Sequence, residues 1–103
     1  MVTIAWDGAG LDKNGSLILL EVEEYVDEYH IKNHLLNLLL MMNRGKTVDT
    51  LIWIAPDAFL GKLKETVEIW GTILESICCL KLPQMKYLSL DEKPIKSLRE
   101  RIM

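Results

Sequence analysis

Apolar and polar residues alternate with a period of two from Ser16 to Asp27, which is the pattern of a β-strand that becomes acidic along its length. Successive side chains of a strand point to opposite faces. One face carries Leu17, Leu19, Glu21 and Glu23, and the other carries Ile18, Leu20, Val22 and Glu24. Two carboxylates spaced by two residues on one face are suited to a divalent cation, because hard cations prefer oxygen ligands. A solvated strand end has the same composition, so both interpretations stay open.

An N-terminal hairpin is the next feature that the pattern predicts. Val2 to Trp6 has the composition of a short strand, and Asn14-Gly15 is the strongest short-range hairpin signal in the chain. We therefore expect Val2–Trp6 to pair antiparallel with the strand that starts at Ser16.

The register of this hairpin decides whether Asp7 joins the acidic face. A two-residue turn would place Asp7 opposite Val22, on the face away from Glu21. A bulge in the Gly8–Gly10 stretch would bring Asp7 to the other face, and glycine is common at bulges. Asp7 therefore joins Glu21 only if the strand is irregular there.

The period becomes helical from Tyr29 to Arg44, and Gly45 is a suitable C-terminal stop. The apolar stripe consists of Ile31, Leu35, Leu38, Leu39 and Met42, and is widened by Leu36, Leu40 and Met41. A stripe this wide needs cover on more than one side, which predicts either a layer between the sheet and a partner or a homodimer through the Leu35–Met42 helix. His30 and His34 lie four residues apart, as helical metal ligands do. No Glu follows His30 and no third ligand is apparent, so we favour a polar helix face.

Strands and helices alternate through the rest of the chain. Val48–Ala55 is a nearly continuous apolar run, typical of a strand buried on both faces, and a strand–helix–strand crossover is expected to be parallel and right-handed. A helix capped by Asp57 runs to about Leu80. Its inward residues are Leu60, Leu63, Val67, Trp70, Ile73, Leu74 and Ile77, and its outward residues are Lys62, Lys64, Glu65 and Glu68. Met85–Leu90 is a final strand, and Pro94 opens a short basic helix.

These elements predict a single α/β domain over residues 1–103, a small mixed sheet with helices in the order ββαβαβα. The length of 103 residues suits one core, and 50% hydrophobic with 26% charged residues is a globular composition. The N-terminus has no secretory pattern and no apolar run approaches the roughly 20 residues of a membrane span. The adjacent Cys78 and Cys79 are expected to be reduced core residues of a cytoplasmic protein.

Charge narrows the function only slightly. The net charge of −3 argues weakly against a surface that binds phosphates through bulk charge. Acidic residues concentrate between positions 21 and 28, whereas the C-terminal stretch is basic, with Lys93, Lys96, Arg99 and Arg101. The sequence has no glycine-rich phosphate loop, no G-x-S-x-G nucleophile motif and no Cys–His pairing. The chemically informative set that remains is Asp7, Glu21 and Glu23.

An Asp at the end of one hairpin strand, a Glu-x-Glu on the next, then a helix and a buried parallel strand resemble the PD-(D/E)xK nuclease superfamily, which has the restriction-endonuclease-like fold. The resemblance covers Val2 to about Ala55. It implies that Asp7, Glu21 and the Val22 carbonyl bind Mg²⁺ or Mn²⁺, and that Glu23 completes the shell or orients the attacking water. The basic residues Lys62, Lys64, Lys96 and Arg99 would contact the phosphates of a nucleic acid, expected to be DNA.

Two features depart from that family. Its third motif position is usually Lys, and here it is Glu23; its core also opens with a helix, whereas this sequence opens with the predicted strand. The expected function is metal-dependent hydrolysis of nucleic-acid phosphodiesters. Two alternatives stay open: a catalytically inactive α/β scaffold or assembly protein that acts through a dimer or partner interface, and an acidic metal-binding module without hydrolysis.

Overall fold

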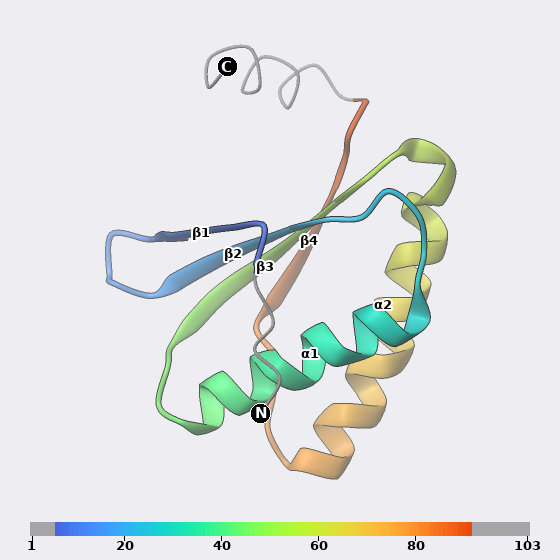
Figure 1. Ribbon diagram of the computed structural model, residues 1–103. Coiled ribbons are helices and arrows are strands. Elements are labelled where there is room, and N and C mark those ends of the chain that lie inside the picture. Colours follow the sequence, from blue (N-terminus) through green and yellow to red (C-terminus); the bar gives the residue numbers. More distant parts are fainter. Residues whose placement is uncertain (1–5, 92–103) are drawn as a thin grey trace.

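The structure is a computed structural model that describes residues 6–91 (Figure 1). Its elements are β1 (Gly8–Leu11), β2 (Leu17–Val22), α1 (Glu28–Asn43), β3 (Val48–Ala55), α2 (Asp57–Cys78) and β4 (Gln84–Ser89). The α/β class and the order ββαβαβ are confirmed. The predicted helix after Pro94 and most of the predicted strand Val2–Trp6 lie outside the described residues, and Trp6 itself is not part of a strand.

The strands form one mixed sheet in the order β1-β2-β3-β4. Strand β1 is antiparallel to β2, whereas β2, β3 and β4 are parallel neighbours, which confirms the predicted parallel crossover. Leu19 of β2 lies beside Leu51 of β3, and Glu21 lies beside Trp53. Residues paired in this way project to the same face of a sheet, so Glu21 shares its face with a core tryptophan.

The turn between β1 and β2 lies at Asn14-Gly15, as predicted, but the paired strand β1 is Gly8–Leu11, the stretch that was expected to interrupt the strand, and the register differs by one residue. Leu11 pairs with Leu17, the Asp12 N–H donates to the Ser16 carbonyl (2.9 Å), and the Gly15 N–H donates to the Asp12 carbonyl (3.1 Å). Gly15 has a φ of +81°, the left-handed conformation that closes a three-residue hairpin loop. The expected two-residue turn is therefore wrong, and the β1–β2 pairing runs without a bulge.

Both helices pack on the face of the sheet that carries Leu19 and Trp53. Their buried side chains and those of the strands form a single cluster, which comprises Leu19, Ile31, Leu35, Leu38, Leu39, Val48, Leu51, Trp53, Ala55, Leu63, Val67 and Leu74. The inner part of the predicted α1 stripe is therefore covered by this chain's own sheet and α2, which Figure 1 shows lying against α1. Leu36 and Leu40 stay exposed (37% and 45%). A homodimer through Leu35–Met42 stays a prediction.

Helix α2 differs from the prediction at both ends. Pro56 is its N-cap and Asp57 is already helical; the Asp57 N–H donates to the Asp91 carboxylate (3.2 Å). An acidic side chain from beyond β4 therefore satisfies one of the free N–H groups at this end. The helix ends at Cys78, because Cys79 adopts a left-handed conformation with a φ of +55°.

Two of the predicted inward residues of α2 are exposed, Ile73(40%) and Ile77 (71%), because the face that meets the core is narrower than the apolar stripe. Both thiols at its C-terminus are free; Cys78 is half-buried, but Cys79 is exposed, so the prediction of a core residue is wrong there. Within residues 6–91, neither helix combines the length and hydropathy that crossing a bilayer requires.

Neighbouring leucines of α1 provide a test of this packing. Leu38 is fully buried, so Leu38→Ala should lower the free energy of unfolding by about 2–5 kcal/mol, through lost burial and a residual cavity. Leu36→Ala, which removes the same atoms from an exposed position two residues away, should cost less than about 1 kcal/mol. Urea denaturation of both variants measures the difference. Equal losses would contradict the orientation of α1.

Candidate metal centre

Two carboxylates from the end of β2 lie beneath helix α1. Glu21 is 2% exposed, because the register with β3 directs it to the helix-covered face. Strand β2 ends at Val22, but the Glu23 N–H donates to the Ile54 carbonyl of β3 (2.8 Å), so the chain stays extended for one more residue. Glu23 is 7% exposed, whereas the next residue, Glu24, is exposed to solvent. The interpretation as a solvated strand end therefore applies to Glu24 and not to Glu21 or Glu23.

Asp7 lies beside Glu21, as the shifted hairpin register requires. The Asp7 backbone N–H donates to Oε1 of Glu21 (3.0 Å), and Oδ2 of Asp7 accepts from the Val22 N–H (2.8 Å). The Asp7 carboxylate is thus directed to the backbone of β2, and the group of converging ligand atoms in the described chain does not include it. In this arrangement Asp7 positions Glu21.

Helix α1 brings two imidazoles to the same place. Asp27 caps the helix, and its Oδ1 accepts from the His30 N–H (3.2 Å), so His30 sits in the first turn. His34 follows four residues later on the same face. The side chain of His34 is 2% exposed and its ring lies 5.0 Å from that of Trp6, whereas the side chain of His30 is 46% exposed. The polar helix face predicted for these two residues is therefore wrong for His34, which is part of the core.

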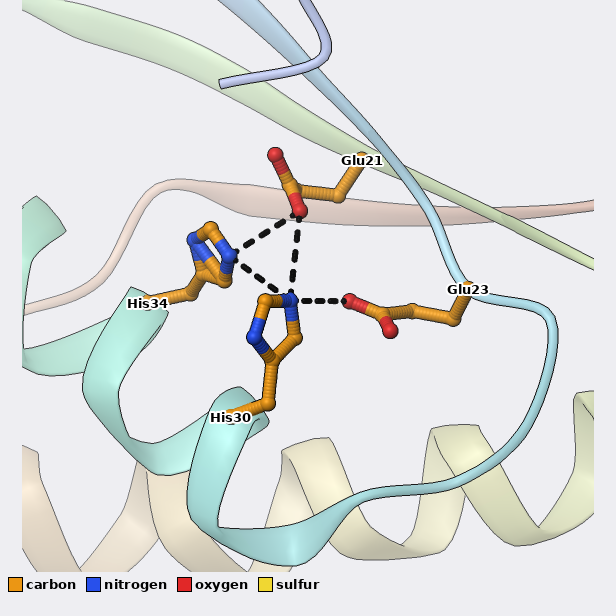
Figure 2. A group of neighbouring side chains, drawn as sticks. All are labelled: Glu21, Glu23, His30 and His34. Atoms are coloured by element: carbon orange, nitrogen blue, oxygen red, sulfur yellow. Dashed lines mark hydrogen bonds and ion pairs between the residues drawn. The ribbon is translucent and has the colours of Figure 1, made fainter. Parts of the chain in front are cut away.

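The four side chains converge, as Figure 2 shows. Nε2 of His30 is 2.9 Å from Nε2 of His34, 3.1 Å from Oε1 of Glu23 and 3.8 Å from Oε2 of Glu21. Nε2 of His34 is 3.1 Å from Oε2 of Glu21. One ligand atom from each of the four residues lies within 4.8 Å of all the others. We call this group the Glu–His cluster.

The separations within the Glu–His cluster suit a common ion. Donor atoms that bind one metal ion at about 2.0–2.2 Å lie roughly 2.8–3.6 Å apart in tetrahedral or adjacent octahedral positions. Three of the four separations above, 2.9, 3.1 and 3.1 Å, lie in that range, and the fourth, 3.8 Å, is slightly longer. The four residues offer two nitrogen and two oxygen donors.

Buried polar atoms of the cluster lack hydrogen-bond partners among residues 6–91. Oε1 of Glu23 makes no hydrogen bond, and its close contact is the 3.1 Å ion pair with Nε2 of His30; Nδ1 of His34 makes no hydrogen bond either. Such atoms are uncommon in folded proteins, because each one loses its hydration without compensation. The Glu23 oxygen, which points into the cluster, can accept a further ligand beside its ion-pair contact with His30, because a carboxylate oxygen has two lone pairs.

Burial disturbs the protonation of the cluster. Burial raises the pKa of Glu21 to about 7; the N–H of Asp7 opposes this effect, and the carboxylates of Asp7 and Glu23 add to it. Burial also raises the pKa of Glu23 to about 7, with a contribution from the carboxylates of Asp7 and Asp27. For His34, burial and then the neighbouring His30 lower the pKa to about 4. At neutral pH the two acids of the metal-free cluster are therefore only partly ionised, while His34 is an uncharged nitrogen donor.

Only some of the site residues predicted from the sequence lie in the Glu–His cluster. Glu21 and Glu23 lie together in the cluster, and Asp7 adjoins it through Glu21. Lys62 and Lys64 are exposed on α2, with Nζ of Lys64 5.7 Å from the centre of the Tyr87 ring. Lys96 and Arg99 lie outside the described residues. The Val22 N–H binds Asp7, and its carbonyl stays a predicted ligand.

His30 and His34 are the site residues that the sequence analysis did not select. A signal for His34 was present: it lies three residues after Ile31 and four before Leu38, within the apolar stripe itself. An imidazole in such a stripe is buried, and the preceding strand supplies acids to pair with it.

No protein-family model matches the sequence, and comparison with curated proteins and with solved structures gives no match. The resemblance to the PD-(D/E)xK superfamily therefore stays a prediction.

The perturbed acid can be tested in metal-free protein. Because the pKa of Glu21 rises from 4.5 to about 7 on folding, its stabilising contribution is full below about pH 4.5 and is lost as the pH rises through about 7. The Gln side chain of Glu21→Gln is neutral at every pH. The free energy of unfolding of this variant minus that of the wild type should therefore be larger at pH 8 than at pH 4.5, by on the order of 2 kcal/mol. Thermal melts in the presence of a chelator measure this difference. The exposed Glu24→Gln is the control, and a Glu21→Gln effect that does not change with pH would contradict the assignment.

Proposed function

We propose that this chain is a metal-binding α/β domain whose centre is the Glu–His cluster. The observation that supports it is the convergence of four donor atoms from β2, its extension and α1 within 4.8 Å of one another. A buried hydrogen-bonding network would account for some of these contacts, but it leaves Oε1 of Glu23 with an ion-pair contact to Nε2 of His30 and no hydrogen bond. An ion would engage this oxygen and replace the protons of Glu21 and Glu23.

The donor set changes the metal expected from the sequence. The three oxygen ligands predicted from the sequence favoured Mg²⁺ or Mn²⁺. The Glu–His cluster instead offers two imidazole nitrogens, which suit Mg²⁺ poorly because this ion prefers oxygen ligands and retains much of its water. Imidazole nitrogens suit Zn²⁺, Fe²⁺, Co²⁺ and Ni²⁺, and a mixed carboxylate and imidazole set is compatible with Mn²⁺ as well. We therefore propose a divalent transition-metal ion in preference to Mg²⁺.

Thermal stability is the direct test of metal binding. A ligand that binds only the folded state stabilises it, by about 2.7 kcal/mol at a hundredfold excess over Kd. For a domain of this size Zn²⁺ or Mn²⁺ should raise Tm by roughly 10 °C or more, and Mg²⁺ much less.

Adjacent glutamates supply the matched control. Glu23→Gln removes a buried donor and should abolish most of the metal-induced shift, whereas Glu24→Gln removes the same charge from an exposed position and should leave the shift intact. Equal metal-induced shifts in the two variants would contradict the proposal.

Phosphodiester hydrolysis is the second candidate function. It is favoured by Asp7 lying beside Glu21 at the end of a hairpin, followed by a helix and a buried parallel strand, as the nuclease resemblance implies. The half-exposed His30 gives this centre an edge that a phosphate oxygen and an attacking water could reach. An ion there would polarise the phosphate and lower the pKa of bound water.

Cleavage of plasmid and oligonucleotide substrates tests this candidate, with Mn²⁺, Zn²⁺ and Mg²⁺ supplied separately. Wild-type protein should cleave and Glu21→Ala, purified identically, should lose activity by at least about a hundredfold, because the ion loses a buried ligand. Cleavage by both proteins would indicate a contaminant. Metal binding without cleavage would instead favour the module without hydrolysis.

A further inference from the structure

The four donors of the Glu–His cluster differ in their exposure to solvent. The side chains of Glu21 and His34 are each 2% exposed and that of Glu23 is 9% exposed, whereas that of His30 is 46% exposed. Solvent therefore reaches the cluster from the side of His30. Any molecule that approaches the ion along the exposed side meets this imidazole first.

The three buried donors are also fixed by the surrounding chain. Glu21 accepts from the Asp7 N–H, and Glu23 follows a backbone bond to Ile54 that extends the β2–β3 pairing. His34 sits in the second turn of α1 and packs against the Trp6 ring. His30 belongs to the first turn of the helix, where fewer backbone bonds hold a residue and local opening costs less free energy.

We propose, on the basis of the metal-binding function above, that His30 is the exchangeable ligand of the centre and that a neutral or singly charged donor atom from outside the protein takes its place on the ion. Glu21, Glu23 and His34 then form a three-ligand set. Three protein ligands with one open position are the usual arrangement of catalytic zinc sites, whereas structural sites are closed by four.

The charge around the centre limits the class of external ligand. Two carboxylates balance the charge of a divalent ion, and Asp7 and Asp27, which hydrogen-bond to the backbone of Val22 and His30, add negative charge at its border. A multiply charged anion is therefore disfavoured. Water, an imidazole and the oxygen of a phosphodiester belong to the accepted class, whereas a phosphate dianion does not.

The test compares His30→Ala with His34→Ala, using Co²⁺ as a spectroscopic probe and imidazole as the external donor. His30→Ala should bind Co²⁺ more weakly than the wild type, and millimolar imidazole should raise its affinity by about tenfold or more and change the visible absorption of the bound ion. His34→Ala should lose Co²⁺ binding, and imidazole should not restore it. Circular dichroism of the metal-free variants checks folding, and His34→Gln, which keeps more of the side-chain volume, replaces His34→Ala if the alanine variant unfolds.

The outcomes separate this proposal from the one on which it rests. Equal loss of Co²⁺ binding in the His30 and His34 variants, or rescue of both by imidazole, would overturn the exchangeable role of His30 while the metal centre stands. Tighter binding of inorganic phosphate than of imidazole to Co²⁺-loaded His30→Ala at pH 8 would overturn the limit on charge. Absence of Co²⁺ binding by the wild type would refute the metal-binding function itself.

Discussion

The pairing of β2 with β3 is the constraint on which the Glu–His cluster depends. It sets Leu19 beside Leu51 and Glu21 beside Trp53, on the face that both helices cover. A one-residue slip would turn Leu19 to the outer face and Glu21 away from α1. Because burying Leu19 is favourable, the hydrophobic register of the strand also buries a carboxylate. That carboxylate then needs either partners or an ion.

The burial of this cluster opposes stability in the metal-free protein. The core of this small domain thus retains two acids with raised pKa values, a buried neutral imidazole and a carboxylate oxygen that makes no hydrogen bond. An ion that engages all four donors would reverse this penalty and link the end of β2 to the start of α1. Groups arranged against the local rules of burial are more common at functional sites than elsewhere.

The sequence predicted the elements well because their signals are local. Periodicity gave α1, β3, α2 and β4 to within about two residues at each end, and the parallel crossover from β2 to β3 followed from the order of elements. The register of the hairpin was not determined, because an Asn-Gly pair is compatible with loops of two and of three residues. The exposed Ile73 and Ile77 were misplaced because the width of an apolar stripe does not show how much of it neighbours cover.

The sequence by itself determined that Glu21 and Glu23 share one face of a strand and that His30 and His34 share one face of a helix, since those relations follow from periods of two and 3.6. Only the tertiary structure decided that these two faces meet. The rotation of α1 about its axis is set by the packing of Ile31, Leu35 and Leu38 against the sheet, and that packing turns His34 inward. A helical pattern names the residues that share a face, but the contacts across the core decide what that face touches.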